Sequence, residues 1–231
     1  MTTITTKVNA TSEPSIYDVL WRINNAQIKH LSVDIVGDCV DGAIISELAA
    51  LHHLLMVREV AGNNRSGNGI NLQCQHGAIK KLCRGRSGKK SLIQYAQFLR
   101  SRFVDANISV VKHALNEDVP PSNTESIILD GPLEDILHTD QLGCINIRHH
   151  VIERYMERTG AKSKTNAWRN IKRILTSGAL TQIIEPDKVK HKAKLKHGKE
   201  SQLWVYKQWG LRLIKDTYCM RLVTVIPYKH I

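Results

Sequence analysis

The segment from His150 to Arg158 carries side chains whose types and spacing suit phosphate chemistry. At about 100° per helical residue, His150, Arg154 and Glu157 fall within about 60° of one another, and Arg158 lies beside them. The apolar residues of the segment fall on the opposite side. The pattern therefore predicts a helix that buries one stripe and presents a His–Arg–Glu–Arg face.

Such a face has three interpretations. It can be a solvated surface with i,i+4 ion pairs, a surface that binds nucleic acid, or a catalytic site. Imidazole exchanges protons near neutral pH, and guanidinium groups hold phosphate with forked hydrogen bonds and stabilise charge on a phosphorane. These groups are the ones a metal-independent ribonuclease needs when the RNA 2′-OH attacks its own phosphodiester.

A second candidate binding element is the segment KVKHKAKLKHGK, whose lysines recur at every second position. They are Lys188, Lys190, Lys192, Lys194 and Lys196. In a strand these ammonium groups lie on one face, about 6.6 Å apart at a rise of about 3.3 Å per residue, and can follow a phosphate backbone. The alternative is a solvated or disordered loop. Trp209, just beyond, is a candidate for stacking on bases.

Net charge separates the two halves of the chain. From Gln141 to Ile231 there are 19 Lys and Arg against 6 Asp and Glu, which gives +13. Residues 1–140 hold the remaining 14 basic and 15 acidic side chains, which gives −1. This asymmetry predicts a polyanion-binding half joined to a neutral half.

The elements that position these residues form an α+β domain over residues 142–231. A helix is expected from about Arg148 to Thr159, where Gly160 ends it, and a second from Ser163 or Thr165 to Gly178. Four alternating segments then predict an antiparallel four-stranded sheet. They are 181–185, 201–206, 211–215 and 221–226.

The sequence H-x-x-E-R at His150 to Arg154, the second helix, the basic strands and the closing VTVI strand resemble small ribonuclease toxins of the RelE and BrnT kind. The resemblance covers roughly residues 145–228. It implies a metal-independent endoribonuclease in which His150, Arg154, Arg158 and Thr224 are catalytic, and a neutralising or regulatory protein partner. A non-enzymatic DNA- or RNA-binding regulator using the same basic surface is the alternative, and RNA is favoured over DNA.

Residues 14–113 predict an α/β domain in which strands and helices alternate. Asp34 on a strand at 31–36 and Glu47 on the following helix are similar to metal-binding carboxylates of the RNase H-like fold, and His76 stands where that fold has a further acid. The resemblance implies a degenerate relative, with a metal-dependent nuclease as a third function; the alternative is an unrelated α/β module. The polar residues 1–13 predict a disordered tail, and residues 114–141 a linker with a short ordered connection.

The five cysteines are scattered without a C-x-x-C pair, which indicates a reducing compartment. The chain lacks a signal-peptide pattern and a membrane-length apolar run, so a cytoplasmic protein without a membrane partner is expected. No motif for a dinucleotide or zinc is present, so no cofactor is predicted.

Overall fold

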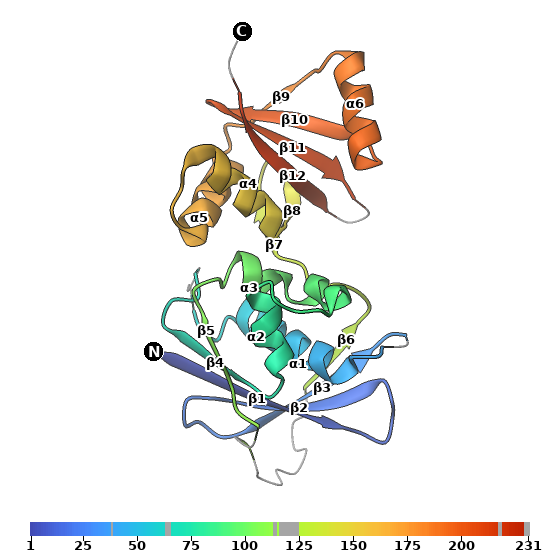
Figure 1. Cartoon of the computed structure of the whole chain (residues 1–231), viewed down its shortest axis with the longest axis vertical. Helices are drawn as coiled ribbons and strands as arrows, with labels where there is room; N and C mark the ends of the chain where they lie inside the picture. The colour runs from blue at the N-terminus through green and yellow to red at the C-terminus, as the bar shows by residue number, and fades with distance from the viewer. Residues whose placement is uncertain (38, 63–65, 113–114, 116–124, 217–218, 229–231) are drawn as a thin grey trace. The chain divides into compact units, whose positions relative to one another are not determined.

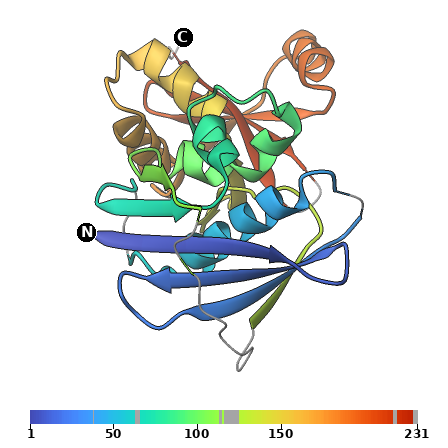
Figure 2. The same cartoon turned by 60° about the horizontal axis from the view of Figure 1, so that its bottom comes forward.

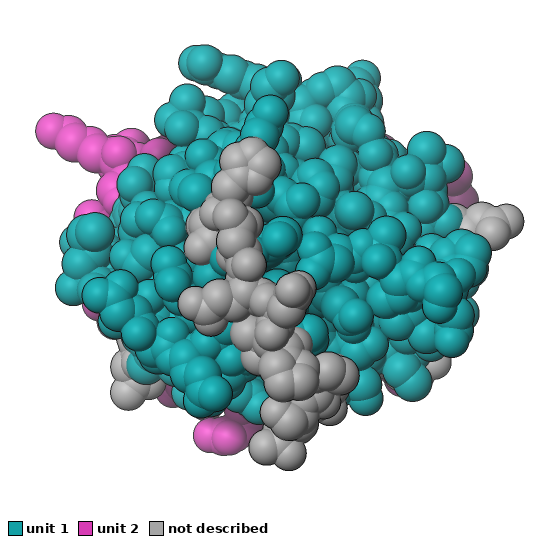
Figure 3. Space-filling view, turned by 90° about the horizontal axis from the view of Figure 1, so that it is seen from below, with its two compact units in different colours: residues 1–133 teal, residues 134–231 magenta. Residues whose placement is uncertain are grey.

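The computed structural model describes residues 1–37, 39–62, 66–112, 115, 125–216 and 219–228. The chain divides into two compact units, Met1–Leu133 (unit 1) and Glu134–Ile231 (unit 2). Figure 3 colours the two units separately. Each is described by itself.

Unit 1 contains a six-stranded mixed sheet in the order β5-β4-β1-β2-β3-β6 (Figure 1). Its strands are β1 (Thr2–Ala10), β2 (Ile16–Ile23), β3 (Lys29–Ile35), β4 (Ile70–Cys74), β5 (Asn107–Val110) and β6 (Glu125–Leu129). The first three strands pair antiparallel, whereas β4, β5 and β6 each pair in parallel with a neighbour. Such parallel pairs need crossover connections, which here contain the helices.

The helical segments of unit 1 cover one face of this sheet (Figures 1 and 2). They are α1 (Gly42–His52), a π-helical turn (His53–Val57), α2 (Gly77–Cys83), a 3-10 helix (Lys90–Tyr95) and α3 (Gln97–Ser101). Leu48 and Leu51 of α1 are fully buried against Leu31 and Val33 of β3 and Leu72 of β4 in one apolar core. The expected α/β alternation is therefore present, with a mixed sheet.

The prediction of a disordered tail over residues 1–13 is wrong, because β1 occupies the interior of the sheet between β2 and β4. Ile4 and Val8 enter the apolar core. Thr5 and Thr6 are also buried, and their hydroxyls donate to Gln73 Oε1 (2.8 Å) and to the Glu47 carboxylate (2.7 Å). Hydroxyl groups that find such partners can be buried at little cost, so a polar sequence forms an interior strand.

Unit 2 contains a second six-stranded sheet, in the order β7-β8-β12-β11-β10-β9. Its strands are β7 (Ile136–Thr139), β8 (Gly143–Ile147), β9 (Thr181–Ile183), β10 (Ser201–Tyr206), β11 (Trp209–Lys215) and β12 (Met220–Pro227). The last four are the strands expected from the sequence, and they pair antiparallel. The sheet has two more strands than predicted and is mixed, because β8 pairs in parallel with β12.

The predicted linker 114–141 is not a linker where the structure describes it. Residues 116–124 lie outside the described residues. Beyond them, β6 belongs to the sheet of unit 1, and β7 belongs to the sheet of unit 2.

The two predicted helices of unit 2 are present as α4 (His149–Thr159) and α5 (Lys164–Leu175). Gly160 ends α4 in the left-handed conformation, with φ of 68°. The Ser163 hydroxyl caps α5 by accepting a hydrogen bond from the Asn166 amide. The second helix ends at Leu175, earlier than the predicted Gly178.

The lysine-rich segment is a helix, α6 (Asp187–His197), and the prediction of a strand there is wrong. Pro186 precedes the helix, Asp187 lies in its first turn, and Gly198 ends it with φ of 72°. Lys, Ala and Leu all favour helix, and these end signals outweigh the period-two pattern. Within the described part of the chain, no helix is both long and apolar enough to cross a membrane.

The interior position of β1 can be tested by stability. Ile4→Ala should lower the free energy of unfolding of unit 1 by about 2–5 kcal/mol, because Ile4 is fully buried. Asn9→Ala, at an exposed position of the same strand, should change it by less than about 0.5 kcal/mol. Urea denaturation of the full chain measures both, and equal effects would contradict the placement of β1.

Candidate nucleic-acid interface

His150 and Arg154 lie one turn apart on α4 and are both half-buried. Burial lowers the pKa of His150, and the positive charge of Arg154 lowers it further. A hydrogen bond to the backbone of Val223 on β12 acts in the opposite direction. The fold therefore favours a neutral His150 imidazole beside a permanently charged guanidinium, against β12.

Arg158 and Thr224, two residues of the predicted catalytic set, are in contact. Nη1 of Arg158 donates to Thr224 Oγ1 at 2.8 Å and to the carbonyl oxygen of Val225. These bonds hold the end of α4 on β12, so Nη1 of Arg158 is occupied by the protein itself. The role of Arg158 in this arrangement is positional.

Three further basic residues join this site and were missed in the sequence. His197 at the end of α6 has its pKa lowered by burial, by its neighbour Lys196, and then by Arg212, Arg154 and Arg221. These charges lie close enough to His197 to oppose its protonation. We call the set His150, Arg154, His197, Arg212 and Arg221 the cationic cluster. A helical reading of residues 187–197 would have placed His197 on the same face as Lys190 and Lys194.

Arg212 is held in place by a nearly buried ion pair. Its two terminal nitrogens contact the two carboxylate oxygens of Glu185 at 2.9 and 2.6 Å, and Nη1 also donates to Ser201 at 2.9 Å. The side chains of Arg212 and Glu185 are only 11% and 8% exposed. This forked pair fixes the segment before α6 to β11.

The predicted lysine ladder is divided by the helix. Lys190 and Lys194 line a groove beside β9 and β10, while the other three lysines of α6 are exposed on its remaining surface. Trp209 lies in a different place: its ring is 5.4 Å from that of Tyr155, and it lines a cavity of about 310 Å³ with Tyr206 and Lys207. Trp209 is therefore not among the residues that meet at the cationic cluster.

The two candidate metal ligands of unit 1 do not meet. Asp34 alternates along β3 with Val33 and Ile35, which face the α1 side in the core, so its side chain lies on the opposite face of the sheet from Glu47. Within the described ranges, no group of three or more His, Cys, Asp or Glu is placed to hold a metal.

Glu47 instead has a complete set of protein partners. Its carboxylate is fully buried and accepts hydrogen bonds from the Thr6 hydroxyl (2.7 Å) and the amides of Gln75 (2.6 Å) and His76 (3.0 Å). Nδ1 of His76 lies 2.7 Å from Glu47 Oε2. Glu47 joins β1, α1 and the end of β4.

The cationic cluster is suited to an anion. Arg154 opposes the protonation of both His150 and His197, and Arg221 adds positive charge from β12 that Asp216, 3.6 Å away, partly offsets. The carboxylate nearest to Arg212 is already committed to that arginine. A phosphate group would offset this repulsion and accept hydrogen bonds from the arginines.

No family model matches this chain, and no curated protein or solved structure matches it either.

The Glu185–Arg212 pair gives a stability prediction. Glu185→Ala leaves a nearly buried guanidinium without its partner and should lower the free energy of unfolding of unit 2 by about 3–5 kcal/mol. Asp187→Ala removes an exposed carboxylate two residues away and should change it by less than about 1 kcal/mol. Thermal and urea unfolding measure the difference. Similar values for the two variants would contradict a structural role for the pair.

Proposed function

We propose that unit 2 binds RNA and cleaves it without a metal ion, with the reacting phosphate in the cationic cluster. The observation that carries this proposal is the shared influence of Arg154 on His150 and His197. This influence supports basic groups of α4 and α6 lying near one another, where a phosphate would relieve their repulsion. The net charge of +13 over the last 91 residues supports a polyanionic ligand.

In the proposed reaction His150 accepts the proton of an RNA 2′-OH. The 2′-oxygen forms a bond to the adjacent phosphorus, and the bond from phosphorus to the 5′-oxygen of the next nucleotide breaks. That 5′-oxygen takes up a proton from water, and the ends are a 2′,3′-cyclic phosphate and a 5′-hydroxyl. Arg154 stabilises the extra negative charge of the phosphorane.

The lowered pKa of His150 supports this assignment. A general base must be unprotonated at the working pH, and an imidazole whose pKa lies below its ordinary value is mostly neutral at pH 7. DNA has no 2′-OH, so the same groups would bind DNA without cleaving it.

The resemblances in the sequence remain part of the proposal. Unit 2 contains β8, α4 and α5 followed by β9 to β12, with β8 beside β12, and this order supports its likeness to RelE and BrnT toxins, to which β7 and α6 are additions. In unit 1, the meeting of Thr6, Glu47 and His76 at β1, α1 and the end of β4 supports a degenerate RNase H-like fold. Only one of these three residues is an acid, so metal-dependent hydrolysis is not proposed for unit 1.

Binding without cleavage is the second candidate function. The observation that favours it is the engagement of Arg158 with Thr224 and Val225, because it leaves Arg154 as the arginine of α4 beside His150. A regulator that binds RNA or DNA would use the same surface and need no proton acceptor.

Cleavage is tested by incubating the full chain with end-labelled RNA in EDTA. We expect products that end in a 2′,3′-cyclic phosphate, and we expect DNA and 2′-O-methyl RNA to bind and stay intact. Arg154→Ala should reduce the cleavage rate by about 100-fold or more and affinity by less, because the arginine acts mainly on the transition state. His150→Gln should abolish the rise of rate with pH below neutrality.

Matched controls are available on the same unit. Arg169→Ala removes an exposed arginine of α5, and His138→Gln alters an exposed histidine of β7; both should cleave at close to the wild-type rate. Tight RNA binding with no cleavage in any condition would establish the second candidate function. Cleavage that survives both Arg154→Ala and His150→Gln would place the active site elsewhere.

A further inference from the structure

The helical conformation of α6 places its lysines on two opposite faces. At about 100° per residue, Lys190, Lys194 and His197 lie within about 60° of one another, and Ala193, the buried residue of this helix, is beside them. The opposite face carries the remaining lysines, which are Lys188, Lys192 and Lys196. One face of α6 is therefore turned toward the sheet, and the other faces solvent.

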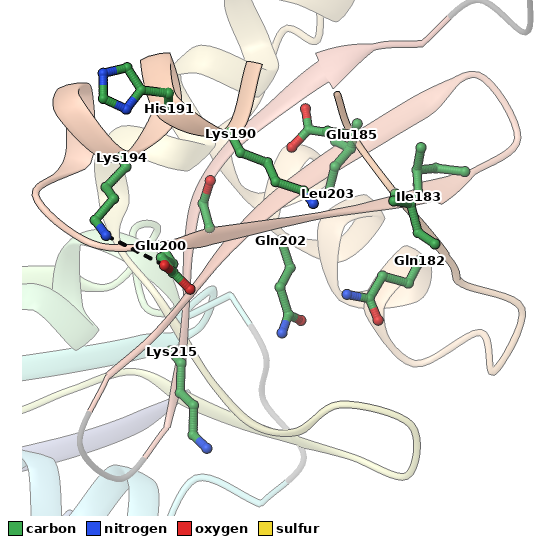
Figure 4. Close-up of a pocket in the computed structure, with 12 residues that line it drawn as sticks. Gln182, Ile183, Glu185, Lys190, His191, Lys194, Glu200, Gln202, Leu203 and Lys215 are labelled. Carbon is green, nitrogen blue, oxygen red and sulfur yellow. Dashed lines mark hydrogen bonds and ion pairs between the residues drawn. The ribbon is translucent and has the colours of Figure 1, made fainter. Parts of the chain in front are cut away.

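A groove of about 590 Å³ lies between the sheet-facing side of α6 and the end of the sheet (Figure 4). The groove lies where β9 and β10 no longer pair. β9 pairs with β10 at Leu203, Trp204 and Val205, and Ser201 and Gln202, the two residues of β10 before them, line the groove. Figure 4 shows Lys190 extending from α6 toward the strands, and His191 pointing away from them. Pockets of about 300–1,000 Å³ hold ligands of small-molecule size.

The walls of this groove differ in chemistry. The α6 wall presents the ammonium groups of Lys190 and Lys194, and Lys215 adds a third from the end of β11. The strand wall presents the amides of Gln182 and Gln202. Oε1 of Gln202 accepts a hydrogen bond from Trp204 Nε1 at 3.0 Å, which leaves its NH2 group to donate to a ligand. Ammonium groups bind phosphate oxygens, and amides can donate to and accept from the edges of unpaired bases.

The carboxylates near the groove do not cancel this charge. Glu185 is neutralised by its forked pair with Arg212. Asp187 lies 3.7 Å from Lys190 and Glu200 lies 3.4 Å from Lys194, but the side chain of Asp187 is fully exposed and that of Glu200 is 87% exposed. Such surface pairs contribute little and yield readily to a stronger ligand. The lysines of the groove therefore keep a net positive charge that attracts a polyanion.

His197 connects the groove with the cationic cluster. It lies on the same face of α6 as Lys194, less than one helical turn further along, and it is close enough to Arg154 and Arg221 for their charges to lower its pKa. Basic side chains thus continue from the reacting phosphate proposed above, past His197, into the groove.

We infer that this groove binds the nucleotides that flank the reacting phosphate, as an unpaired strand with its phosphates toward Lys190 and Lys194. This inference rests on the proposed function, since it assumes RNA in the cationic cluster. A paired duplex keeps its base edges engaged and gains nothing from Gln182 and Gln202. The groove therefore selects single-stranded RNA.

The test compares two double variants of the full chain that remove the same charge from opposite faces of α6. Lys190→Ala with Lys194→Ala changes the groove, and Lys188→Ala with Lys192→Ala changes the solvent face. The probes are a fluorescent single-stranded 2′-O-methyl RNA dodecamer, the matching dinucleotide and the matching duplex, measured by fluorescence anisotropy over a range of salt concentrations.

For the groove variant we expect dodecamer affinity to fall by about tenfold or more, or about 1.4 kcal/mol, with the dinucleotide changed by less than twofold. The slope of the logarithm of its binding constant against the logarithm of salt concentration should become shallower by about 1.4, because two single-strand phosphate contacts of about 0.7 each are lost. The solvent-face variant should lose less than about threefold in affinity for every probe. The two variants should bind the duplex with the same affinity.

Two outcomes separate failure of the groove from failure of the function. The groove is not the site if wild-type protein binds the dodecamer but both double variants lose the same affinity for it. The same conclusion follows if the groove variant loses affinity for the duplex as it does for the single strand. If wild-type protein binds none of the probes, the proposed function is wrong and the inference falls with it. Circular dichroism of both variants verifies that α6 is intact.

Discussion

Repulsion among positive charges around β12 is the constraint on which the account of unit 2 depends. Basic side chains from α4, α6, β11 and β12 approach closely enough to lower the pKa values of His150 and His197. Like charges repel, so other interactions must hold them together. Two interactions of the fold do this: Arg158 holds α4 on β12, and Glu185 holds Arg212 on β11. We propose that a bound anion offsets the repulsion that remains.

In unit 1 the buried charge is fully paired within the protein, unlike the charges of the cationic cluster. Glu47 is fully buried, and its oxygens are occupied by Thr6, by two backbone amides and by His76. A carboxylate satisfied in this manner joins neighbouring elements and has little capacity left for a ligand. The contrast with the cationic cluster is the physical reason for placing the proposed activity in unit 2.

Sequence patterns predicted the elements whose stability is mainly local. The amphipathic stripe and Gly160 identified α4, and Ser163 identified the start of α5. By contrast, β1 depends on partners far along the chain, since Thr5 and Thr6 are buried only because Gln73 and Glu47 accept their hydrogen bonds. The lysines of α6 recur at every second position, which is the period of a strand, but this recurrence reflects only the high lysine content of a helical segment. Residues of α4 could be grouped from helical spacing, whereas His197 joins them only through the tertiary fold.

The titration of His150 and His197 tests the central claim most directly. Both pKa values should lie below the ordinary 6.5 in the free protein and should rise when a non-cleavable 2′-O-methyl RNA binds, because a phosphate favours the charged imidazolium. The exposed His138 of β7, which does not line the groove, serves as the internal reference. NMR of histidine-labelled full-length protein measures all three. Ordinary values in the free protein, or values that do not move when RNA binds, would contradict an anion site at the cationic cluster.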